Sequence, residues 1–256
     1  MALHAKAKAE AGYRFYALYE KISRTDILAH AYAQCRSNKG APGVDGQDFA
    51  DIEAYGVERW LAELALALRR ETYRPEPIRR VFIPKANGKL RPLGLSSVRD
   101  RVCMTAALLV LEPMFEADLP PEIYAYRAGR NAQQAVVEVE ELVFRGHPDV
   151  VDADLADYFG SIPHAELLKS VTRRIADRRV LHLIKMWLEC SPLLANLYMR
   201  RFVLGWKKLG LEQSLGTRLV TYADDLVIPG LRRGRLCAGG ATPKRHCTTC
   251  ARSWAS

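Results

Sequence analysis

The sequence has no apolar run long enough to cross a membrane. Its longest largely apolar stretch, Val102–Leu111, falls well short of the roughly 20 residues that a bilayer requires. The first 15 residues contain no apolar segment of the kind that a secretory signal peptide carries. These absences exclude a membrane-spanning class and favour a cytoplasmic protein without membrane contact.

The sequence also has little cysteine, and none of it is arranged as a disulfide framework. Six cysteines are spread over 256 residues without a secretory signal, which favours free thiols. Cys247 and Cys250 beside His246 have metal-ligand spacing, but a structural zinc site needs four ligands and no second pair stands at suitable spacing. The 49% hydrophobic and 26% charged residues are typical of a globular protein rather than a disordered or fibrous one.

Acidic residues are missing from one segment, and this absence accounts for most of the charge excess. Residues 229–256 carry six Lys or Arg side chains and no acid, while the rest of the chain contributes only three of the net +9 charges. Net charge by itself is therefore weak support for a nucleic-acid partner. The same segment has no hydrophobic periodicity, so we expect it to be disordered.

Hydrophobic periodicity predicts mainly helices, with strands confined to short segments. A helix over 57–70 is marked by an apolar stripe that we expect to be buried, made of Trp60, Leu61, Leu64 and Leu68. Another should begin at Val98 with Ser97 as its cap and stop near Pro113. Further helices are expected over 132–144, 165–175, 178–189 and 191–206. A strand that leads into a turn is expected over 149–159, and two strands joined at an acidic turn are expected over 217–228.

The segment Arg79–Leu95 predicts a basic β-hairpin, because two short β-type runs flank Asn87-Gly88. Taken alone, such a ribbon is more often a charged exposed surface than a site. A strict two-residue Asn-Gly loop would pair Lys85 with Leu90 and place Lys85 and Arg91 on opposite faces. A longer loop would let the two converge, and the sequence leaves both arrangements open.

Two acidic patterns have the residue types of a metal site. Asp152 and Asp154 share one face of a strand, because side chains there alternate with period two. Asp224 and Asp225 follow an apolar run at a tight turn. Three such carboxylates, brought together across a sheet, could hold two Mg²⁺ ions about 3.5–4 Å apart. Each pattern alone is more often a solvated strand face or a plain turn.

A series of short motifs gives these carboxylates a context. They are A-P-G-V-D-G at 41–46, I-P-K-A-N-G-K-L-R-P-L-G at 83–94, R-D-R at 99–101, Y-R-A-G-R at 126–130, V-D-A-D-L at 151–155 followed by Tyr158-Phe159 and I-P-H at 162–164, S-P-L-L-A-N at 191–196, and Y-A-D-D at 222–225. Each fragment is weak alone, whereas the ordered set is specific. Over essentially residues 1–228 the chain resembles the group II intron reverse transcriptases, the LtrA-like intron-encoded maturases.

The resemblance implies an α+β fold, a right-hand polymerase with fingers and an incomplete palm and with the thumb absent. The regions it implies are a helical N-terminal region with the start of the fingers at 1–78, fingers with the basic hairpin at 79–148, an incomplete palm with the carboxylates at 149–228, and a basic tail at 229–256. The implied function is RNA-directed DNA polymerisation for intron mobility and splicing. Its partners would be intron RNA as template, a DNA primer or target, and dNTPs.

Residue roles follow from the same resemblance. Asp154, Asp224 and Asp225 fall on the catalytic carboxylates that bind two Mg²⁺ ions. Lys85 and Arg91 fall on residues that grip the triphosphate, which suits a point charge and a guanidinium fork. Phe159 falls on the aromatic that lies against the sugar of the incoming nucleotide, where its ring would clash with a 2′-OH. Asp152 and Asp157 are competing acids, ranked lower because only Asp154 has the aromatic five residues on.

The chain departs from the family pattern at three places. Gly160 stands where the family usually has Asp, a Pro-Gln-Gly loop is missing before Ser191, and the resemblance ends near Ile228, which suggests a tail read in a shifted frame. We therefore expect a poor polymerase or none from these residues alone. The alternatives are a catalytically inactive RNA-binding remnant or degenerate open reading frame, and a related bacterial reverse transcriptase of defence or diversity-generating type.

Overall fold

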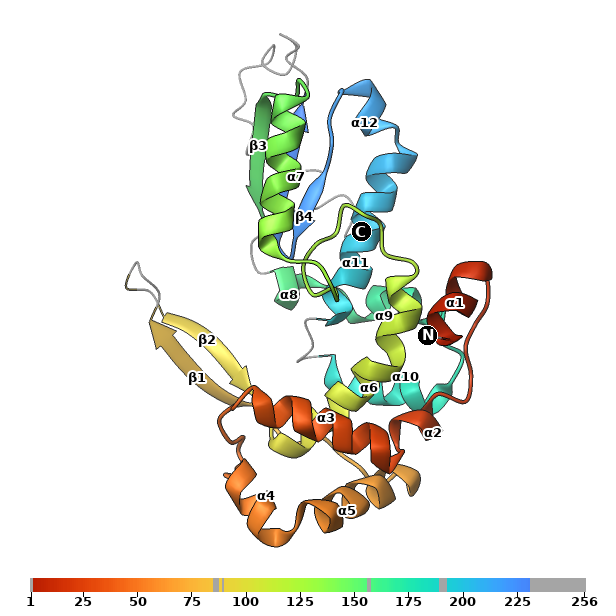
Figure 1. Ribbon diagram of the computed structural model, residues 1–256, viewed down its shortest axis with the longest axis vertical. Coiled ribbons are helices and arrows are strands. Elements are labelled where there is room, and N and C mark those ends of the chain that lie inside the picture. Colours follow the sequence, from red (N-terminus) through yellow and green to blue (C-terminus); the bar gives the residue numbers. More distant parts are fainter. Residues whose placement is uncertain (1, 85–87, 89, 156–157, 189–192, 231–256) are drawn as a thin grey trace. The chain divides into compact units, whose positions relative to one another are not determined.

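The computed structural model describes residues 2–84, 88, 90–155, 158–188 and 193–230 (Figure 1). The chain forms two compact units that are not consecutive in sequence. The first unit comprises Met1–Phe115 with Thr172–Cys190, and the second comprises Glu116–Val171 with Ser191–Ser256. The basic tail from residue 231 onward, including His246, Cys247 and Cys250, lies outside the described residues.

In its described residues, the first unit is helical apart from one hairpin. Its elements are α1 (Ala2–Ala9), α2 (Tyr19–Ile22), α3 (Thr25–Ser37), α4 (Phe49–Tyr55), α5 (Val57–Arg69), β1 (Arg79–Pro84), β2 (Leu90–Leu95), α6 (Val98–Glu116) and α10 (Arg178–Trp187). Helix α5 confirms the predicted stripe, because Trp60, Leu61, Leu64 and Leu68 are all buried. Cys35 and Cys103 are buried free thiols, as predicted for them.

Helix α6 begins as predicted and ends later. The Ser97 hydroxyl oxygen accepts a hydrogen bond from the Asp100 backbone N–H at 3.1 Å, which confirms the cap. The predicted stop near Pro113 is wrong, since the helix continues to Glu116. Burial of Met114 and Phe115 explains the extra turn, because their packing outweighs the backbone hydrogen bond that proline cannot donate.

Tertiary contacts also shorten the helix predicted over 165–175, which is α9 (His164–Thr172). Beyond Thr172 the backbone instead pairs with the N-terminal segment. Phe15 N–H donates to the Arg174 carbonyl at 2.6 Å, and Ala176 N–H donates to the Phe15 carbonyl at 2.7 Å. The Asp177 carboxylate then accepts the N–H groups of Leu18 and Tyr19 at 2.8 and 3.0 Å, so residues 15–19 are held against the start of α10.

The hairpin extends from the helices of the first unit (Figure 1) and differs in register from a two-residue turn. Pro84 pairs with Leu90 and Ile83 with Arg91, so residues 85–89 form the connection. A strict Asn-Gly loop would have paired Lys85 with Leu90, whereas the observed register pairs Pro84 with Leu90 and is therefore shifted by one residue. The register agrees with a connection longer than two residues, and the convergence of the Lys85 and Arg91 side chains stays a prediction. Lys85 itself and the Arg91 side chain lie outside the described part of the structure.

The second unit packs helices against a small antiparallel sheet. Its elements are α7 (Ala132–Phe144), β3 (Asp149–Asp154), α8 (Tyr158–Ser161), α9, α11 (Leu193–Lys208), α12 (Leu211–Ser214), β4 (Val220–Tyr222) and β5 (Asp225–Gly230). The strand order is β3-β5-β4, and α7 lies along this sheet (Figure 1). Ala135 and Leu142 of α7 cluster with Tyr124 and with Val220 of β4, which fixes the helix on the sheet.

Helix α7 begins where the sequence predicts. Asn131 and Gln134 form a reciprocal capping box, with the Asn131 side chain accepting the Gln134 N–H at 2.9 Å and the Gln134 side chain accepting the Asn131 N–H at 3.0 Å. Helices α10 and α11 confirm the helices expected over 178–189 and 191–206, except that residues 189–192 lie outside the described ranges. No helix in the described ranges is both long and apolar enough to cross a membrane.

Candidate active site

The Y-A-D-D motif forms a two-residue turn between β4 and β5. Tyr222 pairs with Asp225, which leaves Ala223 and Asp224 as the turn residues. Ala223 has φ +56°, a left-handed conformation that costs a residue with a Cβ roughly 1–2 kcal/mol. The fully buried Leu226 anchors β5 directly after the turn. Packing therefore holds the turn, and with it two adjacent carboxylates, in a strained backbone conformation of the kind found at functional sites.

Strand pairing brings the distant Asp154 to this turn. Asp154 is the direct cross-strand partner of Asp225, although the two lie 71 positions apart in sequence. One residue further, the Leu155 N–H donates to the Asp224 carbonyl at 3.0 Å. Directly opposed residues in an antiparallel pair have Cβ atoms about 4.5–5.5 Å apart. The backbone thus places Asp154, Asp224 and Asp225 together at one end of the sheet.

The register also separates Asp154 from its nearest competitor. Asp152 pairs with Val227, two residues along β5 from Asp225. It therefore shares a face with Asp154 but lies one step farther from the turn. The other competitor, Asp157, lies outside the described residues.

The carboxylates repel one another. Partial burial, followed by the negative charges of Asp224, Asp154 and Asp152, raises the pKa of Asp225 above its usual value. Within the described ranges none of these four carboxylates forms a salt bridge. Charge repulsion without a basic partner is the electrostatic condition that a bound cation relieves.

The chemistry of this donor set fits a hard divalent cation, which prefers carboxylate oxygens. In the described part of the chain, however, no three His, Cys, Asp or Glu side chains converge closely enough to hold a metal ion. The backbone already places the three residues side by side, so rotation of their side chains is what metal binding would require. Mutual repulsion favours the separated rotamers when no cation is present.

A loop on the other side of the sheet supports the turn, and sequence reasoning gave it no role. Tyr124 N–H donates to the Thr221 carbonyl at 3.0 Å and Thr221 N–H to the Glu122 carbonyl at 2.8 Å, so residues 122–124 cover the outer edge of β4. The buried Asn196 amide donates to the Ala125 carbonyl at 2.7 Å and holds this loop. Asn196 is the last residue of the S-P-L-L-A-N motif, so this motif was the sequence feature that could have pointed to the supporting loop.

Tyr158 interacts electrostatically with Asp224, and the sequence analysis gave it no role. It is 7% exposed, and burial, followed by electrostatic interaction with Tyr198 and Asp224, raises the pKa of its hydroxyl. Its ring therefore stays neutral near the carboxylates. The adjacent Phe159 belongs to α8, but its side chain lies outside the described part, so its role against the sugar stays a prediction. The roles of Lys85 and Arg91 stay predictions too.

Comparison with known proteins places this geometry in a family. Residues 83–235 match the family model described as reverse transcriptase (RNA-dependent DNA polymerase). That match spans more than half of the chain, and the chain belongs to the reverse transcriptase family. The α+β reverse-transcriptase fold that the motifs implied is thereby confirmed.

Individual relatives make the assignment more specific. Protein YkfC of Escherichia coli (strain K12) is 39% identical over 181 residues, which cover 67% of this chain and 46% of YkfC. Group II intron-encoded protein LtrA of Lactococcus lactis subsp. cremoris is 29% identical over 219 residues, covering 75% of this chain and 36% of LtrA. The predicted resemblance to group II intron reverse transcriptases and maturases is confirmed. The chain spans less than half the length of these relatives.

A solved structure shows a weaker likeness. A chain of a partial Cas6-RT-Cas1–Cas2 complex aligns at a TM-score of 0.45 and 21% identity, covering 82% of this chain and 37% of that chain.

Proposed function

We propose that this chain is the polymerase region of a group II intron-type reverse transcriptase that copies an RNA template into DNA in the cytoplasm. One observation carries the proposal: β3 and β5 pair Asp154 with Asp225, next to Asp224, in a member of the reverse transcriptase family. The substrates are a DNA primer and dNTPs. The intron-encoded relatives support intron RNA as the template and a role in intron mobility and splicing.

Asp154, Asp224 and Asp225 are the residues that would hold two Mg²⁺ ions. When bound, such ions activate the primer hydroxyl and neutralise the leaving pyrophosphate. The chain's part is to present three carboxylates from two paired strands and one tight turn. Partial burial and the neighbouring carboxylates raise the pKa of Asp225, and the positive charge of a bound cation would lower it again and favour the deprotonated form. Lys85 and Arg91 would bind the triphosphate, and Phe159 would exclude a 2′-OH.

Primer extension on poly(rA)/oligo(dT) with Mg²⁺ tests the reaction. Since the sequence departs from the family at Gly160 and before Ser191, we expect weak extension, and Asp224→Asn should lower it by about 100-fold or more. The matched control is Asp149→Asn, because Asp149 begins β3 at the opposite end of the same strand. Extension that survives Asp224→Asn would contradict the assignment.

Metal binding tests the carboxylates independently of turnover. Titration with Mn²⁺, followed by electron paramagnetic resonance, should show binding that Asp224→Asn and Asp225→Asn each weaken at least about tenfold. Asp149→Asn should bind Mn²⁺ as the unmodified chain does. Equal Mn²⁺ affinity in all four proteins would show that these carboxylates form no metal site.

A further inference from the structure

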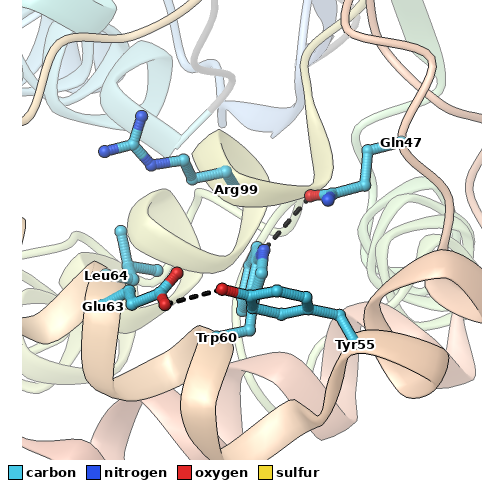
Figure 2. Close-up of a pocket in the computed structure, with 6 residues that line it drawn as sticks. All are labelled: Gln47, Tyr55, Trp60, Glu63, Leu64 and Arg99. Atoms are coloured by element: carbon cyan, nitrogen blue, oxygen red, sulfur yellow. Dashed lines mark hydrogen bonds between the residues drawn. The ribbon is translucent and has the colours of Figure 1, made fainter.

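A cavity of about 290 Å³ lies entirely within the first unit, and the proposed reaction does not use it. It is lined by Gln47, Tyr55, Trp60, Glu63, Leu64 and Arg99 (Figure 2). These side chains come from the loop before α4, the last residue of α4, the first turns of α5 and the first turn of α6. Four separate segments therefore build one concave site.

Two aromatic side chains form one wall, and hydrogen bonds fix both. The Tyr55 hydroxyl donates to Glu63 Oε1 at 2.7 Å, and the Trp60 Nε1–H donates to Gln47 Oε1 at 3.1 Å (Figure 2). Tyr55 remains 44% exposed, whereas Trp60 is only 7% exposed. The Tyr55 ring is thus a preorganised and partly solvent-accessible stacking surface near the buried Trp60 indole.

The opposite wall is cationic. Arg99 lies across the cavity from Tyr55 and Trp60 in Figure 2, and its guanidinium stacks 5.2 Å from the Tyr73 ring centroid. In the described ranges Arg99 forms no salt bridge, so its donors remain available to an anion. The one acid in the lining, Glu63, already accepts from Tyr55 and pairs with Arg59 at 3.3 Å.

The surrounding unit favours an anionic ligand. Its two segments hold 23 Lys and Arg but 15 Asp and Glu, so it is strongly basic even without the tail. Arg59 does not line the cavity, but its guanidinium, paired with Glu63, lies 4.7 Å from the Tyr55 ring centroid and adds positive charge nearby. Aromatic rings beside cationic side chains, of which Arg99 forms no salt bridge in the described ranges, are the chemistry that binds single-stranded nucleic acid.

We propose that this cavity binds one unstacked nucleotide of single-stranded RNA, with its base on Tyr55 and its phosphate on Arg99. The volume is near the lower end of ligand sites, about 300–1,000 Å³, which suits one nucleotide rather than a folded element. The proposal rests on the proposed function only because that function supplies RNA as the ligand. Binding here requires none of the sheet carboxylates.

Fluorescence anisotropy with a labelled octauridylate and the full chain tests the base contact. Stacking on one aromatic ring contributes enough that Tyr55→Leu should weaken binding by about 5- to 150-fold. Tyr55→Phe keeps the ring and should bind within about threefold of the unmodified chain. The matched control is Tyr16→Leu, because Tyr16 is 69% exposed in the same unit but does not line the cavity.

An abasic oligoribonucleotide of equal length and charge separates stacking from electrostatics. Tyr55→Leu should leave abasic binding unchanged, while Arg99→Gln should weaken both ligands and reduce the slope of log K against log salt by about 0.7. Arg24→Gln is the charge control, since Arg24 already pairs with Asp26 at 2.7 Å on the surface. Circular dichroism confirms that each variant is folded.

Three results would overturn the proposal. Tyr55→Leu could bind octauridylate within twofold of the unmodified chain, or it could lose affinity for the abasic and the base-containing ligand equally. Displacement of octauridylate by oligo-glutamate at equal charge would also overturn it, because the site would then be a general anion surface. Asp224→Asn must bind octauridylate normally. If the unmodified chain binds octauridylate as expected but shows no primer extension, that result counts against the proposed function alone.

Discussion

The Tyr73 hydroxyl sits in a buried polar network, and its removal is the sharpest stability test in the molecule. Tyr73 is 1% exposed. Its hydroxyl donates to Asp100 Oδ1 at 2.6 Å and accepts from the Trp187 Nε1–H at 3.1 Å. Asp100 Oδ2 also accepts the Glu76 N–H at 2.8 Å, three residues before β1 begins. The network therefore joins α6, α10 and the base of the hairpin.

Tyr73→Phe removes one oxygen and leaves two buried groups unsatisfied. A hydrogen bond to a charged group contributes about 1.5–3 kcal/mol, and an orphaned buried donor costs about 1–3 kcal/mol more. We expect a loss of about 3–4 kcal/mol in the free energy of unfolding. The matched control is Tyr19→Phe, because the Tyr19 hydroxyl is also buried but donates only to the neutral Leu68 carbonyl at 2.7 Å. That variant should lose about 1 kcal/mol.

Urea titration followed by tryptophan fluorescence measures both variants under one condition. The expected order is unmodified chain, Tyr19→Phe, then Tyr73→Phe, with equal m-values. Amide hydrogen exchange should rise selectively at Glu76 and along β1 in Tyr73→Phe. Equal losses in the two variants, or unchanged exchange in β1, would refute the view that Asp100 and Tyr73 together fix the base of the hairpin.

Three further tests address the turn and two carboxylates. Ala223→Gly should stabilise the fold by about 0.5–1 kcal/mol, since glycine relieves the left-handed strain at φ +56° but loses more backbone entropy; a lower urea midpoint would contradict this. The pKa of Asp225 is raised in the folded state, so ionisation of this carboxyl destabilises the fold as pH rises from the usual Asp pKa through the raised one. Asp225→Asn should therefore be more stable than the unmodified chain at pH 7, and the gain should vanish below the usual Asp range. Burial raises the pKa of Asp177, but four backbone N–H donors outweigh it and hold the pKa below its usual value. The stability that ionised Asp177 contributes is present above the usual Asp pKa and is lost as pH falls through the lowered one. Asp177→Asn should therefore reduce the dependence of the urea midpoint on pH under acid conditions. The same substitution should speed proteolysis near Phe15.

Features that depend on residues close together in the chain could be predicted from the sequence. The start of α7 follows from Asn131 and Gln134, which satisfy each other's backbone donors within one turn. The α5 stripe follows from helical spacing alone. The acidic turn at Ala223-Asp224 likewise needed only its two apolar flanks. The interacting residues are only a few positions apart, so the local sequence was sufficient to predict each of these features.

Features that depend on distant partners were misjudged or left open. The last turn of α6 persists past Pro113 because Met114 and Phe115 are buried, and α9 ends at Thr172 because Arg174 and Ala176 pair with Phe15. The hairpin register differs by one residue from that of the shortest turn. In each case a contact absent from the local sequence outweighed a local preference.

The candidate site shows the same division. The sequence by itself determined which carboxylates were available, and family motifs ranked Asp154 above Asp152. Only strand pairing placed Asp154 opposite Asp225, because register is set by burial on both faces of β5 rather than by either strand alone. Arg99 belongs to the R-D-R motif, but nothing in the sequence connected it with Tyr55 in one cavity. Its walls come from four segments, so only their packing could bring an aromatic ring and an unpaired cation to face each other.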